Sequence, residues 1–263
     1  MTSITVRRIA FQFPASIQRY WLSGSPFRTH LMNSFTLALP LTERWAIRVL
    51  KRSLCRLSDT GVEQDVINFV GQEGQHAAAH AAFWDNLRQQ GYATGGYVRA
   101  IESVLRRFEA CFTPAFNCAI LAGLEHLTEC ISDFGLRHDI FSGAEPKLKQ
   151  LFEWHAAEEI EHKTVVYDAI TSLKVGYLAR ILGLVISHIY VVAAIAFGTG
   201  ILLWQDGLLV RRSIWADAVR LFWIEGFLFE VCENFGAYCR ADFHPSQKDN
   251  ADLAQAVFGD LAE

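Results

Sequence analysis

The chain has 263 residues, of which 51% are hydrophobic and 20% are charged, with 6 prolines and a formal net charge of −4. These proportions suit a folded chain and exclude a disordered one. Lysine and arginine are scattered, with short pairs such as Arg106-Arg107 at most, which excludes a basic surface for nucleic acid. Six cysteines without a CxxC pair or a preceding secretory signal predict reduced core residues and a cytoplasmic protein.

Apolar residues recur three and four positions apart along most of the chain, which predicts an all-α fold. After an irregular start ("FQFPASIQRYWLSGSP"), turn residues such as "SDTG", "GYATGG", "SGAEP" and "QDG" separate the expected helices. These helices cover residues 41–57, 62–90, 97–111, 115–139, 146–174, 177–204 and 213–240. We expect a single domain over residues 1–263.

The segment 181–205 contains no formal charge and is long enough to cross the roughly 30 Å hydrocarbon core of a bilayer. It also contains Ser187 and His188, and cationic residues flank it on both sides, so it gives no orientation bias. We therefore expect residues 177–240 to form an apolar helical pair that packs on the bundle or on a membrane surface, in preference to a spanning helix. Association with the inner face of the membrane stays open.

Two ExxH motifs carry the chemistry of the sequence. The stretch "EWHAAEEIEHK" contains Glu159 and His162, and the stretch "FVGQEGQHAAAH" contains Glu73 and His76. A single glutamate precedes each motif at a similar distance, because Glu43 lies 30 residues before Glu73 and Glu125 lies 34 before Glu159. The chain therefore shows the pattern Glu…ExxH twice, which is far more specific than one ExxH.

This spacing predicts a metal site inside a four-helix bundle. A helix of about 20 residues and a short loop bring the chain back antiparallel, so each single glutamate lies beside the following ExxH. Two such hairpins place four carboxylates and two imidazoles in one core, as in di-metal carboxylate proteins. The alternative is a solvated helix face with charge pairs, but the neighbours ("AILAGLEHL") are apolar and small. We expect two metal ions, preferably iron, with manganese or zinc as alternatives.

Several neighbouring residues leave alternatives open. His155 shares a helix face with Glu159 and His162, so it is either a seventh ligand or a hydrogen-bond partner of a ligand carboxylate. Glu129 lies one turn after Glu125 and competes with it for the ligand role. We expect a supporting role for His80. Glu158 could reach His162, but we expect both Glu158 and Glu161 to lie beside the ligands or on the surface, and we expect His126 to point elsewhere.

The chain resembles a bacterial family named predicted metal-dependent hydrolases, a ferritin-like group. The resemblance covers nearly the full length and rests on "VRRIAFQFP", "SPFRTHLMNSFTLALPLTER", "FVGQEGQHAAAHAAF", "LEHLTE", "WHAAEEIEHKTVVYD" and "YCRADFHP". It implies a ferritin-like four-helix bundle with additional helices. The HxxxExxH spacing of His155, Glu159 and His162 is also similar to that of arylamine N-oxygenases, di-iron enzymes in which an extra histidine binds one iron.

Three functions follow as hypotheses. The preferred one is a di-iron oxidase or oxygenase that activates O2 to oxidise an apolar or aromatic small molecule, with an electron donor that the sequence does not identify. The first alternative is a metal-dependent hydrolase that uses a metal-bridging hydroxide, and the second is a non-catalytic iron-binding protein. The sequence also leaves open the metal, the substrate and the oligomeric state, including a homodimer.

Overall fold

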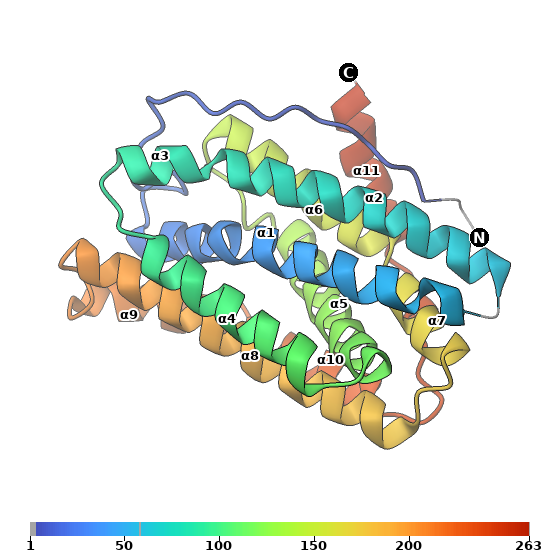
Figure 1. Cartoon of the computed structure of the whole chain (residues 1–263). Coiled ribbons are helices and arrows are strands. Elements are labelled where there is room, and N and C mark those ends of the chain that lie inside the picture. The colour runs from blue at the N-terminus through green and yellow to red at the C-terminus, as the bar shows by residue number, and fades with distance from the viewer. Residues whose placement is uncertain (1–3, 58, 263) are drawn as a thin grey trace.

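The computed structural model describes residues 4–57 and 59–262, and these residues form a bundle of helices (Figure 1). Within these two ranges there is no strand, only an isolated bridge between Leu22 and Ala144. The all-α prediction is therefore confirmed. The α-helices are α1 (Pro26–Ser53), α2 (Thr60–Ala82), α3 (Trp84–Gln89), α4 (Gly95–Cys111), α5 (Pro114–Arg137), α6 (Pro146–Glu161), α7 (Val165–Ser172), α8 (Tyr177–Gln205), α9 (Arg212–Val219), α10 (Phe227–Tyr238) and α11 (Ala251–Ala262). Short turns complete the set: the 3₁₀ turns η1 (Leu54–Arg56) and η3 (Pro245–Gln247), and the π turn η2 (Arg220–Ile224).

Helix α1 begins far earlier than predicted. Ser25 caps it by accepting a hydrogen bond from the Arg28 backbone N–H at 3.2 Å. The prediction of a start at residue 41 was wrong because Pro40 lies inside the helix. Proline has no N–H for the carbonyl four residues earlier, here that of Thr36. The Trp84 indole N–H donates to this carbonyl at 2.9 Å, which satisfies it and lets the helix continue.

Other predicted boundaries also need correction. The expected helix 62–90 is interrupted at Phe83, and the expected helix 146–174 is interrupted just after Glu161. The expected helix 213–240 is divided by η2 and by Gly226, whose φ of 87° lies in the left-handed region. Helix α11 was not predicted. The second helix of the apolar pair is therefore two short helices, although α8 agrees with its prediction.

The cysteine prediction holds in part. All six cysteines are free. Cys118 and Cys130 are buried on α5, as expected for core residues, whereas Cys55, Cys111 and Cys232 are exposed. These three lie on solvent-facing sides of their elements, where apolar periodicity does not apply.

Helices α1, α2, α5 and α6 form the four-helix bundle. Helix α1 packs on α2, and α5 packs on α6. Large buried side chains from these helices, including Trp45, Phe69, Leu121 and Trp154, fill the interior. The first part of the N-terminal segment, residues 4–14, runs without turns over α2 and α6, and turns in residues 15–24 lead to α1 (Figure 1). It closes the side of the bundle on which these two helices lie.

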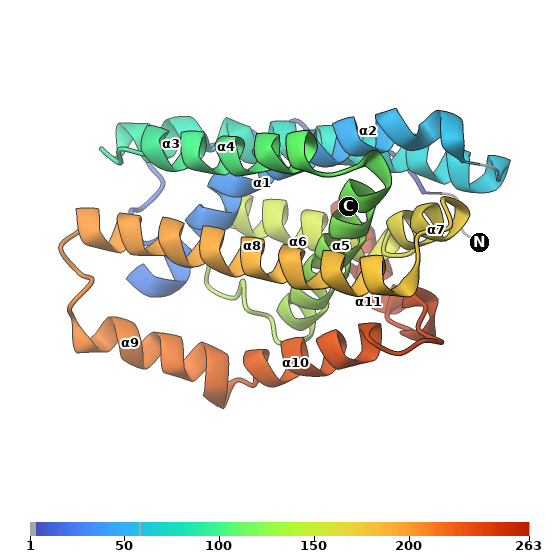
Figure 2. The ribbon, with the colours of Figure 1, turned by 60° about the horizontal axis from the view of Figure 1, so that its bottom comes forward.

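Helix α8 covers the other side of α5. The two helices approach closely at Gly183, where an added Cβ would lie 2.4 Å from the carbonyl oxygen of Ala119. In the described part of the chain α8 is the one helix long and apolar enough to cross a membrane, and only 33% of its most apolar window is buried. Helices α9 and α10 run back beside α8 in a separate row (Figure 2).

Candidate metal centre

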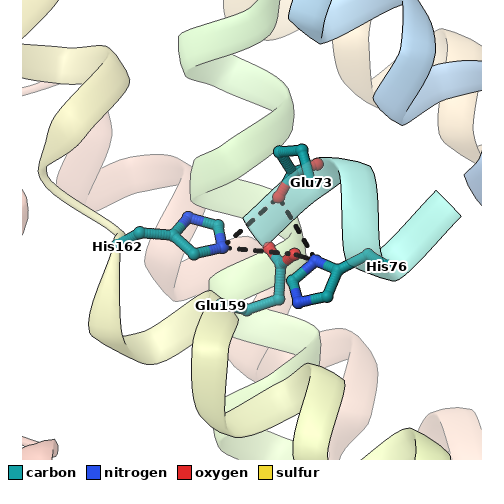
Figure 3. A group of neighbouring side chains, drawn as sticks. All are labelled: Glu73, His76, Glu159 and His162. Carbon is teal, nitrogen blue, oxygen red and sulfur yellow. Dashed lines mark ion pairs between the residues drawn. The ribbon is translucent and has the colours of Figure 1, made fainter. Parts of the chain in front are cut away.

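The six predicted ligands come together inside the bundle. Their exposed fractions range from 0% to 4%. They are Glu43 from α1, Glu73 and His76 from α2, Glu125 from α5, Glu159 from α6, and His162, which caps the end of α6. The two ExxH motifs face each other across the interior (Figure 3). The hairpin geometry expected from the spacing therefore exists in the fold.

Glu73 and Glu159 lie between the two histidines. Glu73 Oε1 is 3.3 Å from His76 Nδ1 and 3.5 Å from His162 Nε2. Glu159 Oε1 is 3.9 Å from His76 Nδ1 and 3.7 Å from His162 Nε2 (Figure 3). One ligand atom from each of these four residues fits within 4.8 Å of all the others, a spacing that a metal ion can bridge.

The remaining two glutamates lie beside different histidines of this group. Glu125 Oε2 is 3.4 Å from His162 Nδ1. Glu43 forms a second compact group with His76 and His155, again with one ligand atom each within 4.8 Å. The arrangement therefore has two overlapping places for a cation that share His76.

Many buried oxygen and nitrogen atoms of this cluster lack hydrogen-bond partners, as expected for atoms that bind a metal ion. Among the described residues, fourteen buried side-chain nitrogen or oxygen atoms have no hydrogen-bond partner, and eight of them belong to the six predicted ligands. Both carboxylate oxygens of Glu43 and both ring nitrogens of His162 are among the eight. Such atoms are rare in native proteins and each costs about 1–3 kcal/mol. Carboxylate oxygens and imidazole nitrogens are ligands for iron, manganese and zinc, so coordination would satisfy these atoms together.

The pKa shifts within the cluster also favour bound cations. Burial and the charge of Glu73 raise the pKa of Glu43 well above its usual value. Burial and Glu159 raise the pKa of Glu125 to about 8. Burial disfavours the charged form of His162, but Glu159 and Glu125 outweigh it and raise the pKa of His162 to about 9. Carboxylates held this close take up protons unless cations balance their charge.

Residues outside the cluster orient His76. Glu158 Oε2 accepts a hydrogen bond from His76 Nε2 at 2.8 Å, which leaves Nδ1 directed at Glu73. Arg7 from the N-terminal segment donates to Glu158 at 3.0 Å and to Glu161 at 2.8 Å. Burial opposes ionisation of Glu158, but His76 and Arg7 outweigh it and lower its pKa.

Sequence reasoning anticipated these supporting contacts only in part. Glu158 was able to reach His162 by its spacing, but its side chain turns to the other histidine, His76. The contribution of Arg7 was missed, since it lies about 150 residues away in the chain. Gln72 was also missed, although it donates to Glu161 at 2.7 Å. The one sequence signal for Arg7 was its place in the first stretch that carries the family resemblance.

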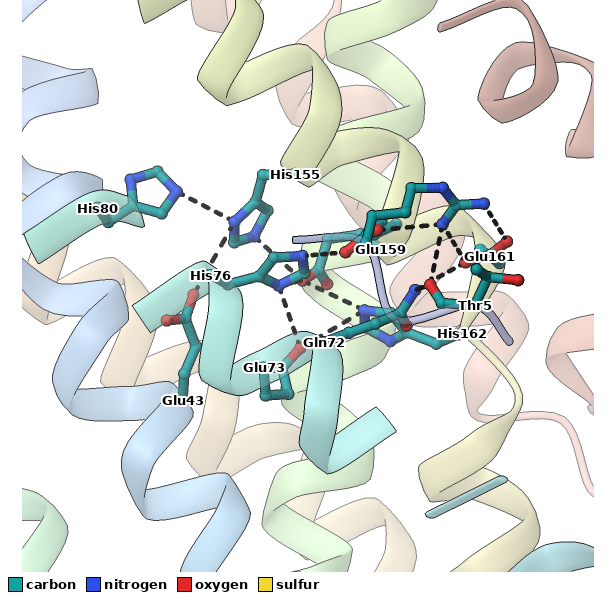
Figure 4. Close-up of polar contacts among 12 residues, drawn as sticks. Thr5, Glu43, Gln72, Glu73, His76, His80, His155, Glu159, Glu161 and His162 are labelled. Carbon is teal, nitrogen blue, oxygen red and sulfur yellow. Dashed lines mark hydrogen bonds and ion pairs between the residues drawn. The ribbon is translucent and has the colours of Figure 1, made fainter. Parts of the chain in front are cut away.

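His155 lies against the cluster, and its Nε2 atom contacts Glu159. Its Nδ1 is hydrogen-bonded to His80 Nε2 at 3.0 Å, and its Nε2 lies 3.1 Å from Glu159 Oε1 (Figure 4). The ring also stacks on His76, with 4.2 Å between the ring centroids. His80 in turn contacts Thr36 Oγ1 at 3.3 Å. His80 thus has the supporting position expected for it.

Glu125 and Glu129, which compete for the ligand role, contact different partners. Glu129 accepts hydrogen bonds from Asn250 at 2.7 Å and forms an ion pair with Lys248 at 3.1 Å. It therefore points toward the C-terminal segment, whereas Glu125 contacts His162. His126 bonds the backbone carbonyl of Asn234 at 2.8 Å, so the expectation that it points elsewhere is confirmed.

Comparison with known proteins agrees with this site. Residues 5–249 match a family described as "Predicted metal-dependent hydrolase". The chain belongs to this family. No curated protein and no solved structure matches the chain. Membership in the family and the buried cluster of histidine and glutamate together indicate metal dependence. The identity of the metal and the number of ions per chain are to be measured.

Proposed function

We propose that the chain is a hydrolase whose centre holds two divalent cations between α1, α2, α5 and α6. The observation that carries the proposal is the convergence of buried ligand atoms without hydrogen-bond partners. The family description supports the reaction class. The proposed ligands are Glu43, Glu73, His76, Glu125, Glu159 and His162, with iron, manganese or zinc as the metal.

The positions of the carboxylates suggest how two cations would share them. Glu73 and Glu159 would hold the metal together with both histidines, because each has an oxygen close to both rings. Glu43 would contribute beside His76, and Glu125 beside His162. Four carboxylates balance the charge of two divalent cations, so a filled centre is neutral and can remain buried.

Two divalent cations held in this way would lower the pKa of a bound water and polarise a substrate oxygen. The residues of the chain orient the ligand histidines and keep water away from them. Glu158 holds the Nε2 proton of His76, so the Nδ1 lone pair faces the centre. The rings of Trp154 and Phe69 meet those of His76 and His162 edge-on, with centroids 4.9 Å and 4.6 Å apart, and exclude water from that side of each histidine.

Oxidation of an apolar small molecule by O2 is the second candidate, and the position of His155 favours it. His80 holds the Nδ1 of this ring while Nε2 faces Glu159, as in a histidine that offers Nε2 to a metal. A seventh, nitrogen ligand is the feature that the resemblance to arylamine N-oxygenases implies. This reaction also requires an external electron donor.

One preparation can separate the two reactions. Metal-free protein is reloaded with Mn²⁺ or Zn²⁺, and separately with Fe²⁺ under anaerobic conditions. We expect the Mn²⁺ or Zn²⁺ form to hydrolyse members of a panel of p-nitrophenyl esters and phosphodiesters. Glu159→Ala should lose this activity, and Glu129→Gln should keep it. If no loaded form hydrolyses any member, while the Fe²⁺ form consumes O2 with an aromatic amine, the hydrolase proposal fails and oxidation replaces it.

A further inference from the structure

Exposed large apolar side chains are concentrated in one part of the chain. In the residues that the structure describes, all of them except Ile67 lie between residues 177 and 229. Five of those on α8 recur at alternating spacings of four and three, as expected for one uncovered side of a helix. These α8 residues are Leu178, Leu182, Val185, Ile189 and Val192, with exposed fractions from 37% to 76%.

A second exposed apolar run lies in the segment that follows α8. It extends along α9 and η2 and contains two tryptophans. Its members are Val210, Trp215, Val219, Trp223 and Ile224, with exposed fractions from 50% to 88%. Helices α8 and α9 belong to neighbouring rows of the molecule (Figure 2). Tryptophan is enriched where a protein meets the boundary between lipid and water.

An apolar cavity of about 460 Å³ opens between these two runs. Its walls include buried side chains such as Phe27 and Met32 of α1, while its rim includes the exposed Val192, Trp215 and Trp223. The volume is in the range of about 300–1,000 Å³ typical of ligand sites. The cavity therefore connects the interior with the exposed apolar surface.

The cavity offers little hydrogen bonding to a ligand. Apart from indole groups, its polar side chains are Thr199 and His188. The Thr199 hydroxyl is bonded to Ser34 at 3.1 Å, and His188 Nδ1 is bonded to the Leu184 carbonyl at 2.9 Å. A hydrocarbon chain is the ligand that such walls accept without loss of hydrogen bonds.

Two cations beside the exposed runs lack an ionic partner in the described part of the chain. Arg211 and Arg212 are exposed, and neither forms an ion pair with any other described residue. The acidic residues between 206 and 229 each have a partner. Asp206 pairs with Arg19 and His30, Asp217 accepts from the Ser25 hydroxyl, and Glu225 pairs with Arg28 and Arg220. The free cations are complementary to anionic headgroups.

We propose that the face formed by α8, α9 and η2 docks on an anionic lipid bilayer, and that the cavity takes a hydrocarbon chain of a lipid. A second copy of the chain is the competing occupant. A contact between two such faces would cover the apolar runs but leave the cavity unfilled and Arg211 and Arg212 without acidic partners. A lipid supplies both a chain and a negative charge. The inference is independent of the reaction at the metal cluster.

Sedimentation with vesicles tests the docking surface. We expect the full-length protein to bind phosphatidylglycerol–phosphatidylcholine vesicles and to bind phosphatidylcholine vesicles more weakly. The double variant Arg211→Ser/Arg212→Ser should lower partition onto the anionic vesicles by roughly 30-fold, because two cations near the surface are lost. Trp223→Ser/Ile224→Ser should also weaken binding to both kinds of vesicle. Ile67→Ser, which removes an exposed apolar side chain elsewhere, is the matched control and should bind like the parent.

A glycine substitution tests the cavity separately. Gly200 lies in the cavity wall, and an added Cβ there would meet no atom within 4 Å. Gly200→Leu should therefore fold and fill part of the cavity. We expect it to weaken binding of the fluorescent fatty acid cis-parinaric acid at least about tenfold, because several methylene contacts are lost. Gly96→Leu on α4, where an added Cβ also meets nothing within 4 Å, should leave binding unchanged.

Clear results would overturn the proposal. Circular dichroism first establishes that each variant is folded. If light scattering shows a dimer and the protein binds neither kind of vesicle, the face would be assigned to a second copy of the chain. Equal vesicle binding by the parent, Trp223→Ser/Ile224→Ser and Ile67→Ser would remove the docking surface, and equal cis-parinaric acid binding by the two leucine variants would remove the cavity site.

Discussion

Helix α5 separates two regions with opposite chemistry. On the side toward α6 it contributes Glu125 to a buried cluster of charged and titratable groups. On the side toward α8 it contributes Leu127, Ile131 and Phe134 to an apolar cavity. Leu127 follows Glu125 by two residues, about 200° around a helix, so one sequence serves both regions. The cluster is buried yet has polar atoms without hydrogen-bond partners, whereas the cavity is lined by almost no polar atoms.

The difference shows two separate routes to a binding site. In the cluster, unsatisfied carboxylate and imidazole atoms define the ligand chemistry, because only cations can satisfy them together. In the cavity, missing apolar contacts define it, because only hydrocarbon fills such a space without loss of hydrogen bonds. Variants on α5, α6 and α8 should therefore affect the two regions independently.

The largest expected effect separates Glu125 from Glu129 on the cluster side of α5. Glu125→Gln should lose at least one metal ion, because a neutral amide replaces the carboxylate beside His162. Glu129→Gln should retain the full metal content, since its partners are Asn250 and Lys248. The metal-to-protein ratio by inductively coupled plasma mass spectrometry measures both. The opposite pattern would exchange the two roles.

A smaller effect is expected one layer out from the cluster. Glu158→Gln should weaken metal binding by roughly 10–100-fold, because the residue fixes the proton on His76 Nε2. Competition with a chelator measures the change. The control is Glu161→Gln, because Glu161 accepts from Arg7 and Gln72 and bonds no histidine in the described part of the chain. Equal loss in both variants would mean that Arg7 alone, and not the orientation of His76, matters.

On the apolar side, two glycines of α8 should respond oppositely. Gly183→Ala places a Cβ 2.4 Å from the Ala119 carbonyl oxygen and should lower the free energy of unfolding by about 1–3 kcal/mol. Gly200→Ala meets no atom within 4 Å and should raise it by up to about 1 kcal/mol through helix propensity. Urea denaturation of the metal-free proteins measures both. Similar changes in the two variants would contradict the close crossing of α5 and α8.

The smallest effect concerns α1, which contributes to both regions. Trp84→Phe removes the donor to the Thr36 carbonyl and should cost about 1 kcal/mol of unfolding free energy. In a Pro40→Ala background the residue at 40 regains an N–H for that carbonyl, so the same substitution should cost less. A double-mutant cycle from denaturation curves gives the coupling. A coupling of zero would remove this explanation of the proline inside α1.

The sequence predicted the cluster better than the helices that carry it. Spacing of 30 and 34 residues between glutamates placed Glu43 and Glu125 beside the correct motifs, because helix length and antiparallel return depend on chain geometry alone. The predicted start of α1 was wrong because a hydrogen bond from the distant Trp84 compensates for the N–H that Pro40 lacks. The role of Arg7 and the choice between Glu125 and Glu129 also depended on long-range partners, which local patterns do not contain.

The central claim is that the buried cluster holds two divalent cations. The most direct measurement is the number of ions bound per chain after metal-free protein is loaded with Mn²⁺ or Zn²⁺ and passed through a desalting column. We expect two in the parent protein and at most one in Glu73→Ala and in Glu159→Ala, because each loses a carboxylate that lies between the two histidines. A parent protein that binds none, or both variants fully loaded with two, would contradict the account.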